Sequence, residues 1–264
     1  MMSVKTEVTQ EKDKKESSAY DLAVVLLQAI AIAIVIRIFL FQPFNIPSGS
    51  MIPTLLVGDY LFVSKYSYGY SKYSFPFGAG MFNGRILASD PNRGDVIVFK
   101  TPRDNSTDYI KRLVGLPGDR IQMIGGQLYV NGEGVKRERA PDAVMDTKCG
   151  PNQTVHQYRE TLPSGRSYLT QKLSETCRLG RFGAADDTEV FVVPPQHYFF
   201  LGDNRDDSAD SRFFDGNGIG YVPSENLVGR ARVLFFSLDE SATWLAPWRW
   251  PLEIRWSRIG TVIH

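Results

Sequence analysis

Two serines near the start of the chain have the setting expected of a nucleophile. Ser48 and Ser50 flank Gly49, and the apolar residues Met51 and Ile52 follow directly. Partial desolvation and a flexible backbone both suit a serine hydroxyl that attacks a carbonyl beside an oxyanion-binding group. The alternative is an ordinary turn, because glycine and serine are common turn residues.

A base for such a serine is present further along, in the stretch DYIKRLVGLPGDRI. In an extended strand, alternation places Lys111 on the face that carries Tyr109 and Leu113. Burial would lower the pKa of Lys111 by disfavouring its charged form, so that the amine could accept a proton near neutral pH. The alternative is an amphipathic lysine at the edge of a strand.

A third stretch, LGDNRDDSADSRFFDGNGIGYVP, is rich in acidic side chains. No glycine and no glutamate fall at the positions that an EF-hand requires, so a calcium loop is not expected. Asp203, Arg205, Asp210 and Arg212 instead offer opposite charges that would fix the backbone beside Ser208. A solvated charged loop is the alternative.

Other hydrolytic chemistry finds little support. The histidines are His156, His197 and His264, and a Ser-His-Asp enzyme would need His197. The sequence has no G-x-S-x-G elbow, no H-E-x-x-H zinc motif and no S-x-x-K. A nucleophile here therefore needs a base other than histidine, and we expect neither a metal nor a cofactor.

An apolar run before the serines predicts a membrane anchor. Leu22–Phe41 is interrupted only by Gln28 and Arg37. Twenty helical residues span about 30 Å, the thickness of the hydrocarbon core. A cleavable signal peptide is one alternative, but no A-x-A-like site follows the run. A buried helix of a soluble protein is the other. We expect a retained helix within residues 20–42.

The predicted orientation depends on the polar tail, residues 1–19. Its basic residues are Lys5, Lys12, Lys14 and Lys15. Positive charges flanking a span favour the cytoplasmic side. Residues 43–264 would then form one extracytoplasmic domain.

That domain is expected to be mainly β. Short runs bounded by glycine, proline, asparagine and aspartate predict an antiparallel sheet without long amphipathic helices. The predicted strands are Tyr60–Val63, Asp95–Phe99, Tyr109–Val114, Arg120–Ile124, Gln127–Val130, Glu189–Val193, Tyr198–Leu201 and Val228–Phe236. The net charge of +1 provides no basic field, so no nucleic-acid partner is expected.

Residues 138–187 are polar and are expected to form an irregular insertion that carries both cysteines. Cys149 and Cys177 have no CxxC spacing, which argues against a metal site. A disulfide is expected if the domain lies in an oxidising compartment, and two free thiols are the alternative.

Aromatic residues gather in two places. Tyr66, Tyr68, Tyr70, Tyr73, Phe75 and Phe77 lie in one loop, and Trp244, Trp248, Trp250 and Trp256 lie near the C-terminus beside arginines. Amphipathic aromatics of this kind suit a bilayer interface, and partial burial in the core is the alternative.

Taken in order, the three stretches resemble the sequence boxes of bacterial type I signal peptidases. The matching patterns are P-S-G-S-M-x-P-T-L, Y-x-K-R-x-x-G-x-P-G-D and G-D-N-R-D-x-S-x-D-S-R. The resemblance implies a serine endopeptidase with Ser50 as nucleophile and Lys111 as general base. Ser48 and the Ser50 N–H would bind the oxyanion, and Ser208 would orient Lys111.

The resemblance also implies a supporting ion pair, Asp210 with Arg212, and an apolar pocket for small substrate residues. The matching pocket positions are Phe44, Ile46, Pro47, Leu55, Val98, Tyr109 and Ile110. Two features depart from the family. Asp207 stands where many relatives have asparagine, and this chain has one apolar span where many Gram-negative members have two.

The expected protein is therefore a membrane-bound peptidase of the bacterial inner membrane, with its catalytic domain in the periplasm. It would cleave signal peptides from exported preproteins after a small-x-small motif, and we expect it to act as a monomer. A self-cleaving Ser/Lys regulatory protease is one alternative, although its relatives are usually soluble. A membrane-tethered binding or assembly module with an inactive site is the other.

Overall fold

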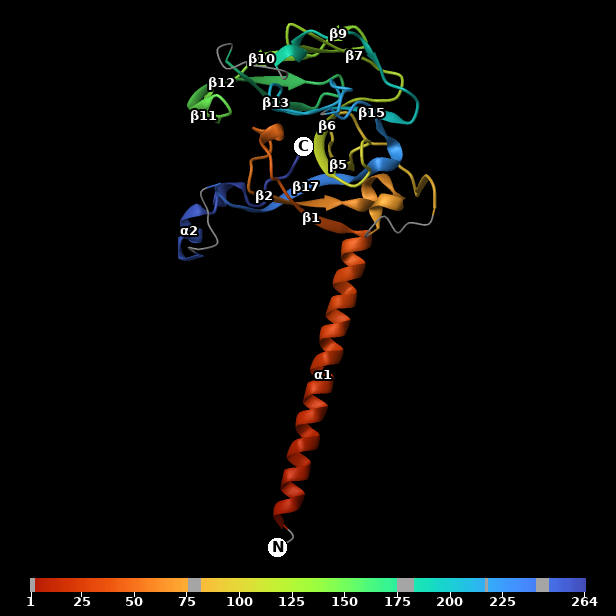
Figure 1. Cartoon of the computed structure of the whole chain (residues 1–264), viewed down its shortest axis with the longest axis vertical. Coiled ribbons are helices and arrows are strands. Elements are labelled where there is room, and N and C mark those ends of the chain that lie inside the picture. Colours follow the sequence, from red (N-terminus) through yellow and green to blue (C-terminus); the bar gives the residue numbers. More distant parts are fainter. Residues whose placement is uncertain (1–2, 76–81, 175–182, 217, 241–246) are drawn as a thin grey trace.

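A single long helix projects from a β domain (Figure 1). The computed structural model describes residues 3–75, 82–174, 183–216, 218–240 and 247–264, with side chains from Tyr20 onward. Helix α1 covers Ser3–Phe39. Its segment Tyr20–Phe39 has a mean hydropathy of 2.7, and none of its most apolar window is buried. An apolar, uncovered helix of this length is what a membrane anchor requires.

The helix ends earlier than the predicted boundary at residue 42. Phe41 already begins strand β1 (Phe41–Asn45), and Pro43 provides the reason. Proline cannot continue a helix, and it biases the residue before it towards extended conformations. The end of α1 is attached to the domain, since Tyr70 Oη donates to the Phe39 carbonyl at 2.6 Å and the Lys65 N–H donates to the Leu40 carbonyl at 3.0 Å.

The central element of the domain is a seven-stranded antiparallel sheet. Its strands, in spatial order, are β1, β2 (Asp59–Ser64), β17 (Leu227–Ser237), β5 (Val96–Lys100), β6 (Asp108–Gly115), β15 (His197–Leu201) and β16 (Val222–Pro223). The mainly β prediction is confirmed. All eight predicted strands are present, with ends that differ by at most two residues.

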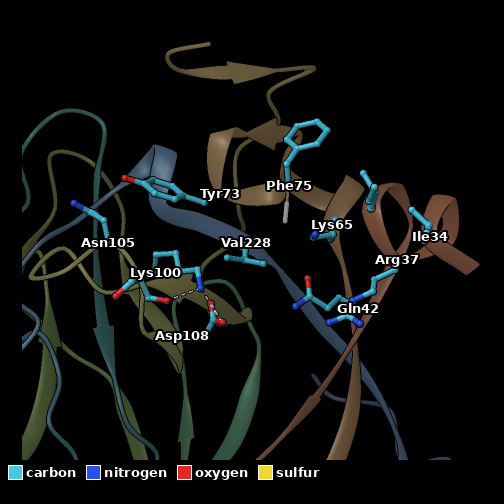
Figure 2. Close-up of a pocket in the computed structure, with 12 residues that line it drawn as sticks. Ile34, Arg37, Gln42, Lys65, Tyr73, Phe75, Lys100, Asn105, Asp108 and Val228 are labelled. Carbon is cyan, nitrogen blue, oxygen red and sulfur yellow. Dashed lines mark hydrogen bonds and ion pairs between the residues drawn. The ribbon is translucent and has the colours of Figure 1, made fainter. Parts of the chain in front are cut away.

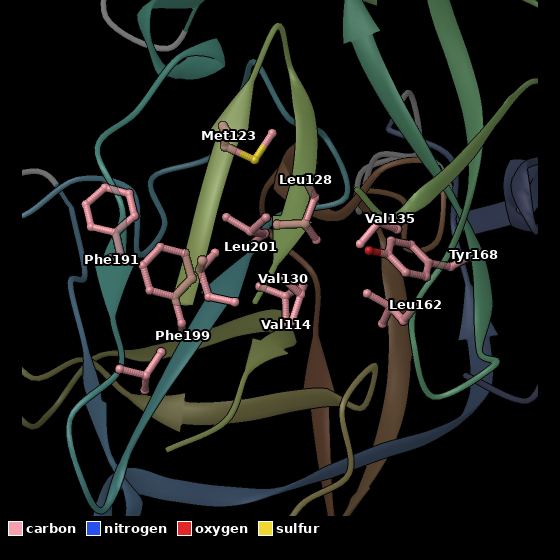
Figure 3. Packing of buried hydrophobic residues seen from close by; sticks show 12 residues of the cluster. Val114, Met123, Leu128, Val130, Val135, Leu162, Tyr168, Phe191, Phe199 and Leu201 are labelled. Atoms are coloured by element: carbon pink, nitrogen blue, oxygen red, sulfur yellow. The ribbon is translucent and has the colours of Figure 1, made fainter. Parts of the chain in front are cut away.

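A second sheet packs against β6 and β15 (Figure 3). Its order is β14 (Phe191–Val192), β7 (Arg120–Ile124), β8 (Gln127–Val130) and β9 (Glu133–Gly134). Met123, Leu128 and Val130 from this sheet are buried against Phe199 and Leu201 from β15. A short pair, β3 (Tyr70–Ser71) with β4 (Arg85–Ile86), lies near the end of α1.

The insertion is more regular than expected. It forms a third sheet from β10 (Lys136–Arg139), β11 (Ala143–Thr147), β12 (Gly150–Thr161) and β13 (Ser167–Leu173). In β12 only Val155 and Glu160 are buried, because an antiparallel sheet can leave one face to water and so needs few apolar residues. Cys149 is disulfide-bonded. Cys177 lies outside the described residues, so their pairing stays a prediction.

Short helices connect these sheets. They are η1 (Gly49–Met51), η2 (Lys65–Tyr68), η3 (Lys72–Ser74), η6 (Gly183–Asp186), η7 (Ser224–Asn226), η8 (Pro247–Arg249), α2 (Trp250–Glu253) and η9 (Trp256–Arg258). Trp248 and Trp256 are exposed, as an interfacial role requires, whereas Tyr68 is buried and donates to Asp95. Trp244 and Phe77 lie outside the described residues.

Candidate active site

Ser50 lies in the one-turn helix η1, which begins after the extended residue Ser48, three residues beyond the end of β1. Its carbonyl accepts a hydrogen bond from the Asn204 N–H at 3.1 Å, and the Gly49 carbonyl accepts from Asn204 Nδ2 at 3.0 Å. Asn204 belongs to the acidic third stretch. These two bonds therefore join the first stretch to the third and hold the Ser50 turn in place.

Lys111 lies on β6 and reaches the same point from the other side. Its Nζ is 2.6 Å from Ser50 Oγ and 3.0 Å from the Ile110 carbonyl. The side chain is only 3% exposed. Burial lowers the pKa of Lys111 to about 8, and the more distant carboxylates of Asp210, Asp203 and Asp207 oppose that shift. A substantial fraction of Lys111 is thus neutral in mildly alkaline solution, and a neutral amine can accept the Ser50 proton.

Ser208 is 1% exposed, and its Oγ has no hydrogen-bond partner within the described part of the chain. It does not hydrogen-bond to Lys111 there. The hydroxyl lies against Gly202, since a Cβ at residue 202 would come within 2.2 Å of Ser208 Oγ and 2.5 Å of the Ser50 carbonyl oxygen. The loop thus places Ser208 beside the Ser50 turn, with its Oγ available for a further hydrogen bond.

Ser48 has an extended backbone and an exposed side chain, and its hydroxyl does not cap η1. It is available to a bound group next to Ser50. Asp207, which stands where many relatives have asparagine, forms an ion pair with Lys148 of the insertion. The lysine therefore neutralises the additional carboxylate.

Asp210 and Arg212 form a fully buried, two-pronged ion pair, with both N–O distances 2.9 Å. Burial alone would raise the pKa of Asp210, but Arg212 and the Gly202 N–H hold it below its ordinary value. Arg212 also donates to the Arg205 carbonyl at 2.6 Å. The pair fixes both ends of the loop that carries Ser208.

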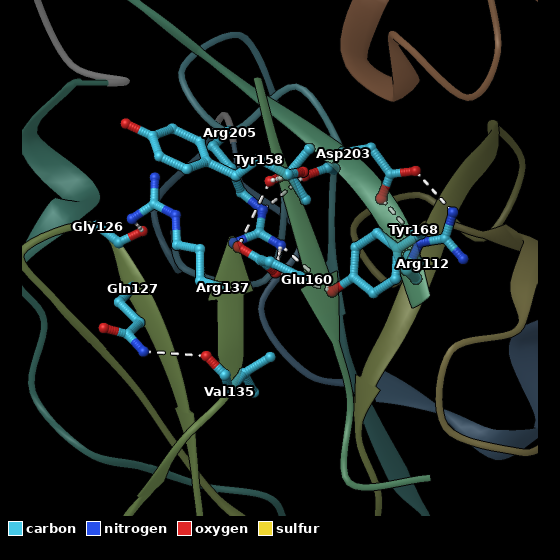
Figure 4. Close-up of polar contacts among 12 residues, drawn as sticks. Arg112, Gly126, Gln127, Val135, Arg137, Tyr158, Glu160, Tyr168, Asp203 and Arg205 are labelled. Carbon is cyan, nitrogen blue, oxygen red and sulfur yellow. Dashed lines mark hydrogen bonds and ion pairs between the residues drawn. The ribbon is translucent and has the colours of Figure 1, made fainter. Parts of the chain in front are cut away.

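A larger buried charge network includes Arg112, the residue that follows Lys111 in the chain (Figure 4). Arg112 Nε and Nη2 donate to the two carboxylate oxygens of Asp203 at 2.8 and 2.7 Å. The Tyr168 ring stacks 4.0 Å from the Arg112 guanidinium, and Arg205 pairs with Glu160 at 2.5 Å. Tyr168 and Glu160 of the insertion thus hold Arg112 and the acidic loop in place, a role that their sequence positions did not predict.

One signal in the sequence predicts part of this network. Arg112 lies on the opposite face of the strand from Lys111, and the apolar residues of this strand indicate that it is buried. A buried arginine requires a carboxylate partner. The role of Gly202 leaves no such signal, because close approach to Ser208 depends on the folded loop.

Five of the seven predicted pocket residues come together. Phe44, Ile46, Leu55, Val98 and Ile110 belong to one apolar cluster, with Phe44 and Ile110 only partly buried. Tyr109 packs in a neighbouring cluster, and Pro47 is exposed. The cluster lies next to η1, so a small apolar side chain bound there would be close to Ser50.

Of the three histidines, His264 meets the charge network through its backbone carbonyl, which accepts from Arg112 Nη1 at 2.8 Å, and the other two lie in other parts of the chain. His156 contacts Arg139 and Asp142 in the insertion, and His197 Nδ1 contacts the Pro195 carbonyl at 2.9 Å. Across the described residues, no three His, Cys, Asp or Glu side chains are grouped as a metal site would need.

Comparison with known proteins identifies relatives over most of the chain. The family described as "Signal peptidase, peptidase S26" matches residues 19–236. Proteins named signal peptidase I from Rickettsia conorii and Rickettsia typhi are 44% and 45% identical, over 79% of this chain and 76% of each relative. A crystal structure of a signal peptidase I from Enterococcus faecalis is 27% identical and covers 54% of this chain and 97% of its own, with a TM-score of 0.30.

Proposed function

This chain belongs to the signal peptidase I family of peptidases, and we propose that it cleaves leader peptides from exported preproteins with a Ser50–Lys111 dyad. The observation that carries this proposal is the 2.6 Å distance between Ser50 Oγ and Lys111 Nζ. Burial of that lysine supports its role, because a protonated amine could not act as the base.

In the proposed reaction, Lys111 Nζ takes the Ser50 hydroxyl proton while Oγ attacks the scissile carbonyl carbon. The Ser50 N–H and the Ser48 hydroxyl stabilise the oxyanion of the tetrahedral intermediate. Lys111 then gives its proton to the departing amine, and an acyl-enzyme forms on Ser50. Water, deprotonated by the same amine, attacks the ester carbonyl and restores the serine.

Substrate placement follows from the strand arrangement. Strand β1 is at one end of the central sheet, so one of its backbone edges is unpaired in the described structure. An extended peptide can add to such an edge through main-chain hydrogen bonds. Its side chains would then meet the Phe44 and Ile110 surface, which favours small residues before the scissile bond.

The dyad is tested with Ser50→Ala, Lys111→Ala and Lys111→Arg on a short Ala-x-Ala peptide in detergent. All three variants should lose cleavage, the arginine variant because a guanidinium stays protonated. His197→Ala should retain it. Turnover by Lys111→Arg would rule out the lysine base, and an inactive wild type would favour a tethered binding module instead.

We further propose that α1 anchors the enzyme in the inner membrane with a cytoplasmic N-terminus. The four lysines of the polar tail support this orientation. Protease added outside spheroplasts should then digest the β domain and spare the N-terminal tail. Protection of the β domain would reverse the orientation.

A further inference from the structure

A cavity of about 800 Å³ lies where α1 meets the β domain (Figure 2). Ile34, Arg37 and Ile38 from the last turns of α1 form part of its lining. The β domain contributes Lys65, from the start of η2, and Lys100, from the end of β5. The cavity includes neither member of the proposed dyad.

Positive charge is in excess around this cavity. Lys100 Nζ is 3.0 Å from Asp108 Oδ2 and donates to the Ser106 carbonyl at 2.6 Å, so Asp108 neutralises Lys100. Among the described residues that line the cavity, Asp108 is the sole carboxylate. Arg37 and Lys65 have no carboxylate at ion-pair distance among the described residues, and Lys65 Nζ donates to the Ser74 carbonyl.

The excess of positive charge affects the pKa of Lys65. Its side chain is 3% exposed. Burial lowers the pKa of Lys65 to about 8, and repulsion by Arg37 adds to that effect. A bound anion would restore the charge balance for both cations, since each favours its charged form beside a negative group.

The position of the cavity relative to the bilayer indicates where that anion would come from. Arg37 is two residues before the end of the Tyr20–Phe39 span, so it lies about 3 Å from the end of the apolar segment. The span is about as long as the hydrocarbon core is thick, which puts this end at the level of the lipid headgroups. Ile34 and Ile38 add an apolar surface on the bilayer side.

We propose that this cavity binds the headgroup of an anionic phospholipid. Arg37 and Lys65 would hold the phosphate, and an acyl chain would lie along Ile34 and Ile38. A zwitterionic lipid fits less well, because its ammonium group would add positive charge to a cavity whose lining already has an excess of positive charge. The site would hold the domain in a fixed orientation at the membrane surface, whatever chemistry the domain performs.

The test uses the full chain in phosphatidylcholine vesicles that contain spin-labelled lipid. The relative association constants of labelled phosphatidylglycerol and labelled phosphatidylcholine are measured by electron paramagnetic resonance. The wild type should prefer phosphatidylglycerol, and Arg37→Gln and Lys65→Gln should each reduce that preference by about fivefold. Lys72→Gln is the matched control, because Lys72 pairs with Glu225 outside the cavity and should leave the preference unchanged.

The Arg37 side chain is exposed, so Arg37→Gln still tests the site if the buried Lys65→Gln variant does not fold. Equal preference in the wild type and Arg37→Gln would overturn the proposal, as would an equal loss in Lys72→Gln. Displacement of the labelled lipid by millimolar inorganic phosphate would assign the cavity to free phosphate. Displacement by a leader peptide would assign it to the substrate.

Discussion

Arg112 and Asp203 are joined by two hydrogen bonds of 2.8 and 2.7 Å, and both side chains are 1% exposed. Asp203 also accepts from Thr54 Oγ1 at 2.5 Å, and Arg112 Nη1 donates to the Gly94 and His264 carbonyls at 2.8 Å. One ion pair therefore connects the strand of Lys111, the segment after Ser50 and the acidic loop.

Asp203→Asn should destabilise the domain severely. The substitution leaves the Arg112 guanidinium buried without its counter-ion, a change that typically costs about 3–5 kcal/mol. Urea unfolding measures the effect. Glu138→Gln is the control: it removes an exposed ion pair with Lys136 and should change stability by less than about 1 kcal/mol. Similar losses in both variants would mean that the buried pair has no special role.

Gly202→Ala should impair catalysis even where the fold survives. The added methyl would lie 2.2 Å from Ser208 Oγ and 2.5 Å from the Ser50 carbonyl, so the loop or the Ser50 turn must move. Displacement of about 1 Å at a reacting group can cost roughly 100-fold in rate. Gly216→Ala serves as the control, because its added methyl would meet no atom of the described residues within 4 Å. Unchanged kcat/KM in Gly202→Ala would show that the Ser50 turn tolerates the movement.

The activity of the enzyme should depend on pH through the buried amine of Lys111. Since its pKa is lowered to about 8, kcat/KM should rise with pH until about that value, as the neutral amine accumulates. A kcat/KM that stays constant between about pH 6 and about pH 9 would argue against Lys111 as the base.

Lys111→Met should be more stable than the wild type at neutral pH. Below pH 8 the folded chain bears the full cost of a buried ammonium, and above it that cost is progressively lost until the unfolded chain also deprotonates near 10.5. A gain of about 1–3 kcal/mol in thermal or urea unfolding at pH 7 is expected, shrinking towards high pH. Loss of stability in the methionine variant at pH 7 would show that the lysine contacts outweigh the burial cost.

Ser208 is expected to act by positioning Lys111. Its buried Oγ has no hydrogen-bond partner among the described residues, lies next to the Ser50 turn and could accept a hydrogen bond from the amine once substrate arrives. Ser208→Ala should lower kcat about 10–1000-fold with little change in KM. Ser208→Asp should move the onset of activity to higher pH, because a carboxylate stabilises the ammonium form. Full activity with an unmoved onset would reduce Ser208 to a loop residue.

Substrate choice should reflect the partly buried Phe44 and Ile110 surface. Peptides with alanine or glycine before the scissile bond should be cleaved, whereas phenylalanine at that position should not fit. The ratio of kcat/KM for the alanine and phenylalanine peptides measures this selectivity. Equal values would place the specificity pocket elsewhere.

Elements with local sequence signals could be predicted before the structure was known. The strands around Leu61, Lys111 and Leu128 follow from alternation and turn residues, and the anchor follows from an unbroken apolar run. The three sequence boxes likewise identified Ser50, Lys111 and Ser208 as candidates. A polar composition misled the interpretation of the insertion, because half-exposed strands such as β12 contain few apolar residues.

Which of these groups meet could not be predicted from local patterns, because it depends on contacts between distant parts of the chain. Ser50 and Lys111 are 61 residues apart in the chain, and Arg112 and Asp203 are 91 apart. Such contacts depend on how the sheet curls and how its loops cross, which no local period encodes. The same reason applies to the cavity at the end of α1, where Arg37, Lys65 and Lys100 become neighbours only after the helix docks on the domain.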